Sequence, residues 1–367
     1  MKSLIRLKPA IRAFAGEAVI RVKIVRSLSE QVWRDFIDRH PQSNIFHAPE
    51  MYEVFSRAKG HAPAIWAALG EDERILALLL PVRVSVLGHP FQKLTSRSIA
   101  YGSVLCEPDD EGQKALTALL DDYKKSVKKG VLFTELRNLH DLGPVQPVLQ
   151  SQGFAYDEFL NSRIDLKCTK EELMLRIGAR TRKNIRRAWR NRNLAIEEVK
   201  QKAQVKISYG LLQKTYSRAG VFLADQSLFD AAFDILHPKK MLRILLVKAG
   251  DAFIATSIKL LFKETICGWY SGLDREKRRF NPNELLMWHI LEWGIDHDYK
   301  TYDFGAIGKP HQKYGVRDFF LKFRGDLFCF GRNTCVHSPG LLCLSKIGYS
   351  LYQIMPVARP QRLSPED

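Results

Sequence analysis

The 367-residue sequence lacks several patterns that identify common classes of protein. None of its six cysteines forms a CxxC pair, and no Cys/His or His/Glu spacing resembles a metal site. The GxSxG turn of a serine nucleophile does not occur. No apolar run is long enough to span a membrane, and basic residues interrupt the N-terminal segment, so no signal peptide is expected. These absences argue against a zinc protein, a serine hydrolase and an integral membrane protein.

The triplet Asp303-Phe304-Gly305 matches the magnesium-binding triplet of protein kinases, but the rest of a kinase is missing. A kinase also needs a Gly-rich phosphate loop, a strand lysine and an HRD loop. None of these precedes the triplet. The segment from Pro282 to Gly305 instead predicts a helix, a turn and a short strand.

Acidic residues are few relative to basic ones. Lys and Arg number 57 against 40 for Asp and Glu, which gives a formal net charge of +17. This balance favours polyanionic partners, among them nucleic acid, nucleotide sugars and anionic lipid. The cysteines lie scattered in apolar stretches, which favours buried free thiols and a cytoplasmic protein. With 46% hydrophobic residues, the chain has enough apolar material for the cores of two domains.

The segment from Arg176 to Asn193 carries seven arginines and Lys183 without one acidic residue. A Thr169/Glu172 capping box is expected to open the preceding helix, and Gly178 to interrupt it. The second run places Ile185, Ala188 and Trp189 on one face and leaves the arginines for the rest. A solvated helix face is one interpretation. We prefer a wall that binds phosphate, with Arg182 and Arg186 as candidates, because guanidinium suits bidentate phosphate contacts.

The order of predicted elements repeats once along the chain. Each half has a strand, a strand with a turn, an amphipathic helix and another strand, at 77–88, 96–105, 113–130 and 131–138, and again at 253–262, 264–273, 283–299 and 300–307. We therefore predict two copies of one mixed α/β domain, with a boundary near residue 160. The predicted domains are 1–160, with residues 1–20 flexible, and 161–338, followed by an apolar segment and flexible tail at 339–367.

Six segments together resemble a known family, the Fem-like tandem-GNAT acyltransferases. They are SNIFHAPEM (43–51), SRSIAYGSVL (96–105), FTELRN (133–138), RKNIRRAWRNRNLAIEEV (182–199), NELLMWHILEWGIDHDYKTYDFG (283–305) and KYGVRDFFLKFRGD (313–326). The family includes aminoacyltransferases of peptidoglycan cross-bridges and BioF2-like acetyltransferases of polysaccharide loci. The resemblance covers residues 25 to 335 and implies an α/β fold of two GNAT-like domains that share a cleft and form an amide.

The resemblance also implies where a donor phosphate would bind. Ordinary GNAT enzymes hold the pyrophosphate of coenzyme A on a Gly-rich turn at a helix N-terminus. This chain has no glycine in the corresponding stretch, and Arg278 and Arg279 precede the Pro282-Asn283 helix start. We therefore add these two arginines to the candidate donor site.

Acyl transfer to an amine needs a deprotonated nucleophile, donors for the developing oxyanion and a route for the proton. Lys322 is the candidate for charge stabilisation, and Asp303 and Glu135 for orienting or deprotonating the amine; the alternatives are a surface lysine on a strand and two internal salt bridges. The candidates for acceptor binding are Tyr101, Tyr270, His311, Lys313 and Tyr314, with core packing or loop solvation as the alternative. No covalent intermediate is expected.

The sequence thus predicts a cytoplasmic N-acyltransferase that acts on an amine of a cell-envelope or sugar-type acceptor, with the active cleft mostly in the second domain. The donor is acyl-CoA, acyl carrier protein or aminoacyl-tRNA, and no metal or permanently bound cofactor is expected. A tRNA-dependent peptidoglycan-bridge transferase is the first alternative. A non-catalytic RNA- or nucleotide-binding protein is the second, because the arginine segment alone would fit it. Peripheral contact with the inner face of an anionic membrane is a further expectation.

Overall fold

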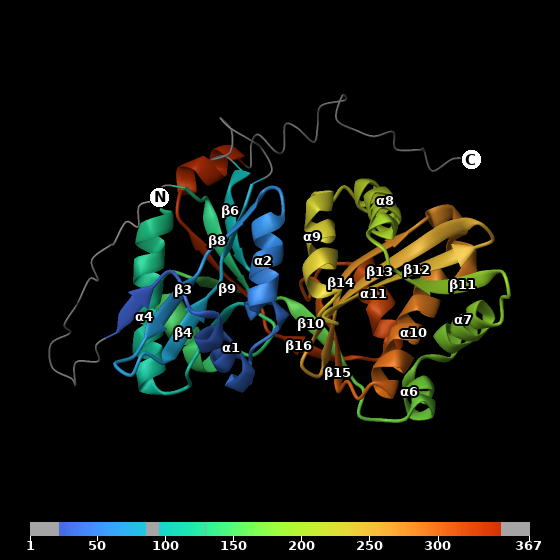
Figure 1. Ribbon diagram of the computed structural model, residues 1–367, viewed down its shortest axis with the longest axis horizontal. Coiled ribbons are helices and arrows are strands. Elements are labelled where there is room, and N and C mark those ends of the chain that lie inside the picture. Colours follow the sequence, from blue (N-terminus) through green and yellow to red (C-terminus); the bar gives the residue numbers. More distant parts are fainter. Residues whose placement is uncertain (1–21, 86–94, 129, 346–367) are drawn as a thin grey trace. The chain divides into compact units, whose positions relative to one another are not determined.

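The computed structural model describes residues 22–85, 95–128 and 130–345, which fall into two compact units (Figure 1). Within these residues, the first unit comprises 22–52, 60–157 and 331–345, and the second comprises 53–59 and 158–330. The predicted flexible segment 1–20 and most of the predicted tail lie outside the described residues.

The second unit is built on one seven-stranded sheet with the strand order β11-β12-β13-β14-β15-β10-β16. Its strands are β10 (Leu160–Asp165), β11 (Leu194–Glu198), β12 (Leu242–Ala249), β13 (Ala252–Phe262), β14 (Thr265–Leu273), β15 (Thr301–Ala306) and β16 (Asp326–Cys329). Its helices are α6 (Lys170–Arg176), α7 (Ala179–Trp189), α8 (Lys202–Ala219), α9 (Gln226–Leu236), η3 (Arg275–Phe280), α10 (Pro282–Asp296), α11 (Gly315–Phe320) and η4 (Leu321–Phe323). All neighbouring strands are antiparallel except β14 and β15, which are parallel.

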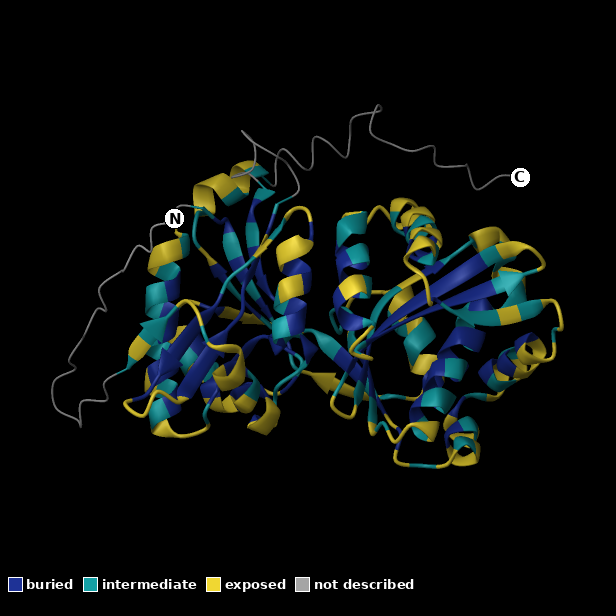
Figure 2. Ribbon diagram, in the orientation of Figure 1, coloured by how far each residue is buried: buried dark blue, intermediate teal, exposed yellow. Residues whose placement is uncertain are grey.

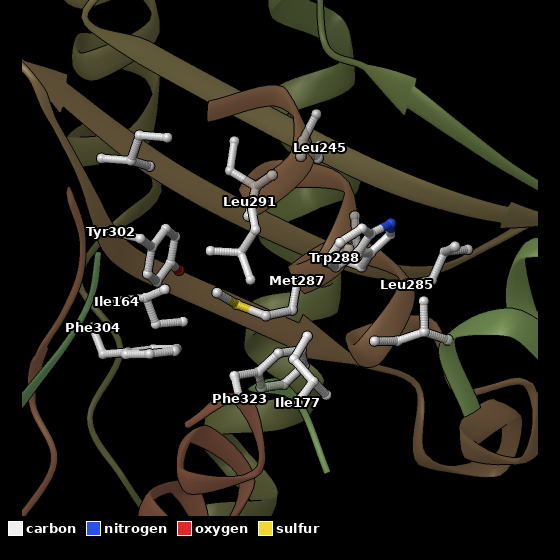
Figure 3. Close-up of a cluster of buried hydrophobic side chains, with 14 of the residues drawn as sticks. Ile164, Ile177, Leu245, Leu285, Met287, Trp288, Leu291, Tyr302, Phe304 and Phe323 are labelled. Carbon is white, nitrogen blue, oxygen red and sulfur yellow. The ribbon is translucent and has the colours of Figure 1, made fainter. Parts of the chain in front are cut away.

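The main core of this unit lies between the sheet and α10 (Figure 3). Trp288, Leu291 and Met287 of α10 pack with Tyr302 of β15 and Leu245 of β12. The burial of this predicted amphipathic helix extends around most of its circumference, because Leu285, Leu286, Met287, Trp288, Ile290 and Leu291 are all buried. A helix with apolar residues around most of its circumference belongs inside a core. α10 is therefore a central element, and its two ends are fixed by packing.

The parallel pair β14 and β15 separates soon after it begins. The strands pair at Thr265, Ile266 and Cys267 of β14, opposite Thr301, Tyr302 and Asp303 of β15, and at no later residue. The register of β14 against β13 also shifts, since Ile258 pairs with Tyr270 and Lys259 with Gly268. Trp269 is therefore an extra residue in the ladder, a β-bulge. The C-terminal halves of the two strands are left without each other as partners.

The first unit has two sheets, with the orders β1-β3-β4-β7 and β2-β5-β6-β8-β17-β9. Their strands are β1 (Lys23–Val25), β2 (His61–Pro63), β3 (Trp66–Leu69), β4 (Ile75–Leu79), β5 (Val82–Val84), β6 (Arg97–Ala100), β7 (Val104–Cys106), β8 (Phe133–Arg137), β9 (Ala155–Asp157) and β17 (Arg332–Val336). The helical elements between them are α1 (Glu30–Arg39), η1 (Ile45–His47), α2 (Pro49–Arg57), α4 (Asp110–Val127), η2 (Gly143–Val145) and α5 (Gln146–Ser151). α4 buries Leu116, Leu119, Leu120 and Tyr123, which are spaced as on one face of a helix, so the amphipathic helix predicted at 113–130 is confirmed.

The two units exchange one strand each. β17 follows the whole second unit in sequence, yet it lies in the first unit's sheet between β8 and β9. β10 follows β9 directly, yet it lies in the second unit's sheet between β15 and β16. The predicted division at 161–338 placed β17 with the second domain. Local patterns show that a strand is present but not which sheet it joins, so they do not reveal this exchange.

A substitution at Gly272 of β14 can test how closely α8 packs on the sheet. A Cβ atom at Gly272 would lie 2.7 Å from the carbonyl oxygen of Leu211 in α8, so the backbone would have to move. We expect Gly272→Ala to lower the free energy of unfolding by about 1–3 kcal/mol in urea denaturation. Gly210→Ala is the matched control, since a Cβ there meets nothing within 4 Å and alanine favours the helix. Equal stability of the two variants would contradict the packing.

Candidate functional site

Arg182, one of the predicted phosphate ligands, has a structural role. The predicted capping box of α6 is present, with Thr169 and Glu172 bonded to each other's backbone N–H groups. At the other end of α6, the Arg182 guanidinium donates to the carbonyl oxygens of Leu175 at 2.8 Å and Ile177 at 2.9 Å. Basic side chains commonly satisfy the free carbonyls of a helix C-terminus in this way. Arg182 therefore holds α6 and α7 together.

The buried face of α7 is narrower than the sequence predicted. Thr181, Ile185 and Ala188 are buried, but Trp189 is 55% exposed. The prediction that Trp189 shares the buried face is wrong, because at 100° per residue it lies a quarter turn beyond Ala188. The remaining surface of α7 consists mainly of basic side chains.

The cations of α7 divide into two groups by their position around the helix. Asn184 donates to Glu284 in the first turn of α10 at 3.5 Å, which marks the side of α7 that meets α10. Arg180 and Arg187, at i−4 and i+3 from Asn184, share this side. Arg186 lies more than 150° around the helix from Asn184. The predicted ligand Arg186 therefore points away from the start of α10. Arg180 and Arg187 are the arginines of α7 on the side of that helix start.

The start of α10 combines free backbone donors with nearby arginines. Asn281 adopts a left-handed conformation with φ of 53°, Pro282 begins the helix, and no side chain caps its first N–H groups. The preceding η3 carries the predicted Arg278 and Arg279, both exposed. Uncapped N–H groups, the helix dipole and guanidinium groups all favour an anion at this position.

The corresponding helix of the first unit is built in the opposite way. Asp109 caps α4 by accepting a hydrogen bond from Gly112 N–H at 2.7 Å, and Asp110 and Glu111 lie in its first turn. Carboxylates at this end stabilise the helix but repel an anionic ligand. α10 also has one carboxylate, Glu284, in its first turn, but no side chain caps its N–H groups and two arginines precede it. Of the two related helix starts, that of α10 therefore suits a phosphate better.

Both predicted acids, Asp303 and Glu135, form ion pairs with arginines on the exchanged strands. Asp303, whose side chain is 4% exposed, accepts from Arg163 of β10 at 2.8 Å and from Gly305 N–H at 2.7 Å. Glu135 accepts from Arg137 at 2.6 Å and lies 3.3 Å from Arg332 of β17. Burial raises the pKa of Glu135, but Arg137 and Arg332 outweigh burial and lower it. These contacts favour the salt-bridge alternative over a role in proton transfer.

Lys322 lies in η4 and not on a strand, so the alternative of a surface lysine on a strand holds only in its exposure. The helical turn forms because Phe323 enters the core beside α10 and Arg324 takes a left-handed φ of 59°. Lys322 itself is exposed, with its Nζ 5.5 Å from the ring centroid of Phe319. Its role in charge stabilisation stays a prediction.

Aromatic side chains gather beside the bulge in β14. The ring of Tyr270 lies 4.9 Å from that of Phe229, 5.1 Å from Trp269 and 5.8 Å from Tyr216 of α8. Burial, followed by the proximity of Tyr314, raises the pKa of Tyr216 to about 12.

Two of the predicted acceptor residues, Tyr270 and Tyr314, thus lie near a third tyrosine that the sequence analysis missed. Tyr216 could not be recognised because it lies in the middle of a long helix with no distinctive motif. The predicted His311 and Lys313 are exposed in the loop that leads to Tyr314.

Tyr101, predicted to bind the acceptor, belongs to the first unit and is packed there. Its ring stacks on Phe46 with 5.6 Å between centroids, and the Arg137 guanidinium lies 5.1 Å from it. Burial raises the pKa of the Tyr101 hydroxyl. These contacts favour the packing alternative for this residue.

A buried lysine, which the sequence analysis missed, lies in the core of the second unit. Lys259 of β13 is 5% exposed, and its Nζ donates to Tyr302 Oη at 2.6 Å. Burial lowers the pKa of Lys259 to about 8. Gly268 makes room for the pair, because a Cβ there would lie 3.1 Å from Tyr302 Oη. A lysine in the apolar strand 253–262 was the available signal.

Two classes of feature are absent from the part of the chain that the structure describes. No three His, Cys, Asp or Glu side chains gather there as a metal site. None of the helices there is both long enough and apolar enough to cross a bilayer.

The ion pair between Arg163 and Asp303 can be tested with a double-mutant cycle. We expect Arg163→Gln and Asp303→Asn each to lower the free energy of unfolding by about 3 kcal/mol, because each leaves a charge without its partner. The double variant should cost little more than either single one. Urea denaturation measures all four proteins. Additive losses, with Asp303→Asn folded normally but inactive, would support a catalytic carboxylate instead.

The buried Lys259 predicts how stability depends on pH. The pKa of Lys259 is lowered from 10.5 to about 8 on folding, so its charged form destabilises the folded state below pH 8. This penalty, about 3 kcal/mol at 1.36 kcal/mol per pH unit, disappears as the pH rises from 8 to 10.5. Urea denaturation across this range should show a rise in stability that Lys259→Met lacks. The same rise in both proteins would show that Lys259 is not the source.

Comparison with known proteins supports this architecture. Residues 179–313 match the family described as "Acetyltransferase (GNAT) domain". No curated protein matches the chain.

The fold of nearly the whole chain occurs in solved structures. A crystal structure of FemX has a TM-score of 0.66 at 16% identity and covers 89% of this chain and 99% of its own. A tandem GNAT protein from the clavulanic acid biosynthesis pathway has a TM-score of 0.56 at 11% identity, covering 87% and 99%. L-PGS from Bacillus licheniformis has a TM-score of 0.52 at 12% identity, covering 83% and 96%.

The family match lies in the second unit, and the likeness to tandem proteins extends over both units. The predicted α/β fold class is confirmed: the chain has the tandem-GNAT fold, and the Fem-like resemblance seen in the sequence is supported.

Proposed function

We propose that the protein is an N-acyltransferase whose second unit binds the acyl donor. The observation that carries this proposal is the difference between the two related helix starts. α10 begins with uncapped N–H groups beside Arg278 and Arg279 and has one first-turn carboxylate, Glu284, whereas α4 begins with three carboxylates, one of which caps it. A phosphate-bearing donor is therefore stabilised at the second unit and repelled at the first.

The separated ends of β14 and β15 suit the reacting carbonyl group. Where two parallel strands stop pairing, and where a bulge adds a residue, backbone N–H groups are left outside the ladder. Such groups stabilise the negative charge that develops on a carbonyl oxygen during acyl transfer. The amine nitrogen bonds to the carbonyl carbon, the bond to the donor's sulfur or oxygen breaks, and the amine loses a proton.

Tyr216 and Tyr314 then lie where an acceptor or a leaving group can be hydrogen-bonded. The Tyr216 hydroxyl, with its pKa of about 12, stays protonated at neutral pH and acts as a hydrogen-bond donor. We assign no general base, because Asp303 and Glu135 are held by arginines. The proton is taken by water or by the leaving group.

Acyl-CoA is the donor that the α10 site supports best. Arg180, Arg187, Arg278 and Arg279 suit a compact pyrophosphate. Acyl carrier protein and aminoacyl-tRNA are the other donors. The Fem-like resemblance, which the likeness to FemX supports, favours an acceptor of the cell-envelope or sugar type, and a transferase that uses aminoacyl-tRNA is the second candidate. A non-catalytic RNA-binding protein would not need the separated strands or the bulge.

The donor site is tested by replacing its two η3 arginines. We expect Arg278→Gln with Arg279→Gln to weaken coenzyme A binding at least tenfold in calorimetric titration, because each lost charged contact costs about 1.5–3 kcal/mol. The melting temperature should hardly change, since both side chains are exposed. Arg83→Gln, at an exposed arginine of β5, is the matched control.

The same titrations at increasing salt distinguish the donors. Binding to tRNA releases many counterions and weakens steeply with salt, whereas coenzyme A shows a shallow dependence. Coenzyme A binding that is unchanged in the double variant would overturn the donor site at α10. Steep, salt-sensitive tRNA binding without coenzyme A binding would replace acyl-CoA by aminoacyl-tRNA as the donor.

A further inference from the structure

The side of α7 that faces away from α10 has no place in the proposed reaction, and its composition is unusual. It carries Arg186 and Arg190 with the exposed Trp189, and the exposed Leu175 and Arg176 of α6 lie at its beginning. We name these five residues the α6–α7 surface. We propose that the α6–α7 surface docks the protein onto a lipid bilayer with anionic headgroups.

The apolar part of the α6–α7 surface is exposed to an unusual degree. Leu175 is 72% exposed, more than any other large hydrophobic residue that the structure describes, and Trp189 is 55% exposed. The Arg182 guanidinium donates to the backbone carbonyl of Leu175, which places the end of α6 beside the first turns of α7, and Trp189 follows Arg182 by about two helical turns on the same face of α7. Figure 2 shows exposed residues along the outer side of α7, while its opposite side is buried.

Within α7, the charged part of the α6–α7 surface is uncompensated, because this helix contains no acidic residue. The acids of α6, Glu171 and Glu172, lie in its first turn, about one helical turn before Arg176. In the part of the chain that the structure covers, no carboxylate forms an ion pair with Arg176, Arg186 or Arg190. Arg186 and Arg190 are four residues apart, so they repel each other unless an anion lies between them. The free energy of the isolated protein is therefore raised by a cluster that a negatively charged surface would stabilise.

The combination of these two parts distinguishes a bilayer from a nucleic acid. Phosphates of RNA would pair with the arginines but would leave Leu175 in water. At a lipid surface, arginines bind headgroup phosphates while Trp and Leu enter the interface, and tryptophan is enriched at that depth. Each basic residue near an anionic surface strengthens the attraction. A bilayer therefore satisfies both the charged and the apolar side chains.

Docking through this surface would leave the donor site free. Arg180 and Arg187 lie on the α10 side of α7, whereas Arg186 lies on the other. The inference does not rest on the proposed function, since a non-catalytic protein with the same helix would dock equally.

The experiment measures co-sedimentation of the full chain with vesicles. We expect binding to vesicles of phosphatidylcholine with phosphatidylglycerol and none to phosphatidylcholine alone. Leu175→Ala with Trp189→Ala, and separately Arg186→Gln with Arg190→Gln, should each weaken binding at least tenfold. All four side chains are exposed, so both variants should unfold at the parent urea concentration.

Matched controls distinguish vesicle binding through the α6–α7 surface from nonspecific binding through other exposed aromatic or basic side chains. Phe222→Ala removes another exposed aromatic ring, and Arg83→Gln with Arg218→Gln removes two other exposed arginines. Both control variants should bind vesicles like the parent. Trp189→Phe should also keep most of the binding but lose the blue shift of tryptophan fluorescence that vesicles produce.

Three outcomes would overturn the proposal. The first is equal binding to neutral and anionic vesicles, and the second is equal weakening by the controls and by the α6–α7 variants. The third is a protein that does not bind vesicles but binds tRNA, with a tRNA affinity that falls in the Arg186→Gln, Arg190→Gln variant and not in the Leu175→Ala, Trp189→Ala variant. That result would make the α6–α7 surface a nucleic-acid site.

Discussion

An arginine on the exchanged strand, paired with an acid on the next strand, anchors that strand in the sheet of each unit. In the second unit Arg163 of β10 bonds to Asp303 of β15, and its guanidinium lies 5.0 Å from the ring centroid of Phe330. In the first unit Arg332 of β17 lies against Glu135 of β8. Each pair fixes a strand that arrives from the other stretch of chain.

The repetition of this pair in both units explains why the two acids stand at matching places in the sequence. Carboxylates at matching strand ends were candidates for orienting or deprotonating the amine, with internal salt bridges as the alternative. Arg137, the nearer partner of Glu135, is only two residues away, but Arg163 and Arg332 lie 140 and 197 residues from their acids, so no local pattern could reveal those two partners. The same limit applies to the strand exchange itself. The elements could be predicted from periodicity, but their sheet partners could not.

The arginine segment 176–193 shows how much of a binding site can be predicted from charge alone. Its composition predicted an anion-binding wall, and the structure divides that wall into three roles. Arg182 closes the end of α6, Arg180 and Arg187 share a side with the start of α10, and Arg186 faces away. The division depends on which residue of α7 touches α10. That residue is Asn184, an uncharged residue that no sequence pattern distinguishes from its neighbours.

The exchange of strands also sets the order in which the chain can fold during synthesis. β9 pairs with β17 and not with β8, so the sheet of the first unit stays incomplete until residues 332–336 have been made. Nearly the whole chain must therefore leave the ribosome before β8 gains its second neighbour and β9 its partner. Contacts between such distant residues slow folding and leave strand edges exposed meanwhile. A nascent chain arrested after β9 would present the open edge of β8, which makes truncated forms prone to aggregation.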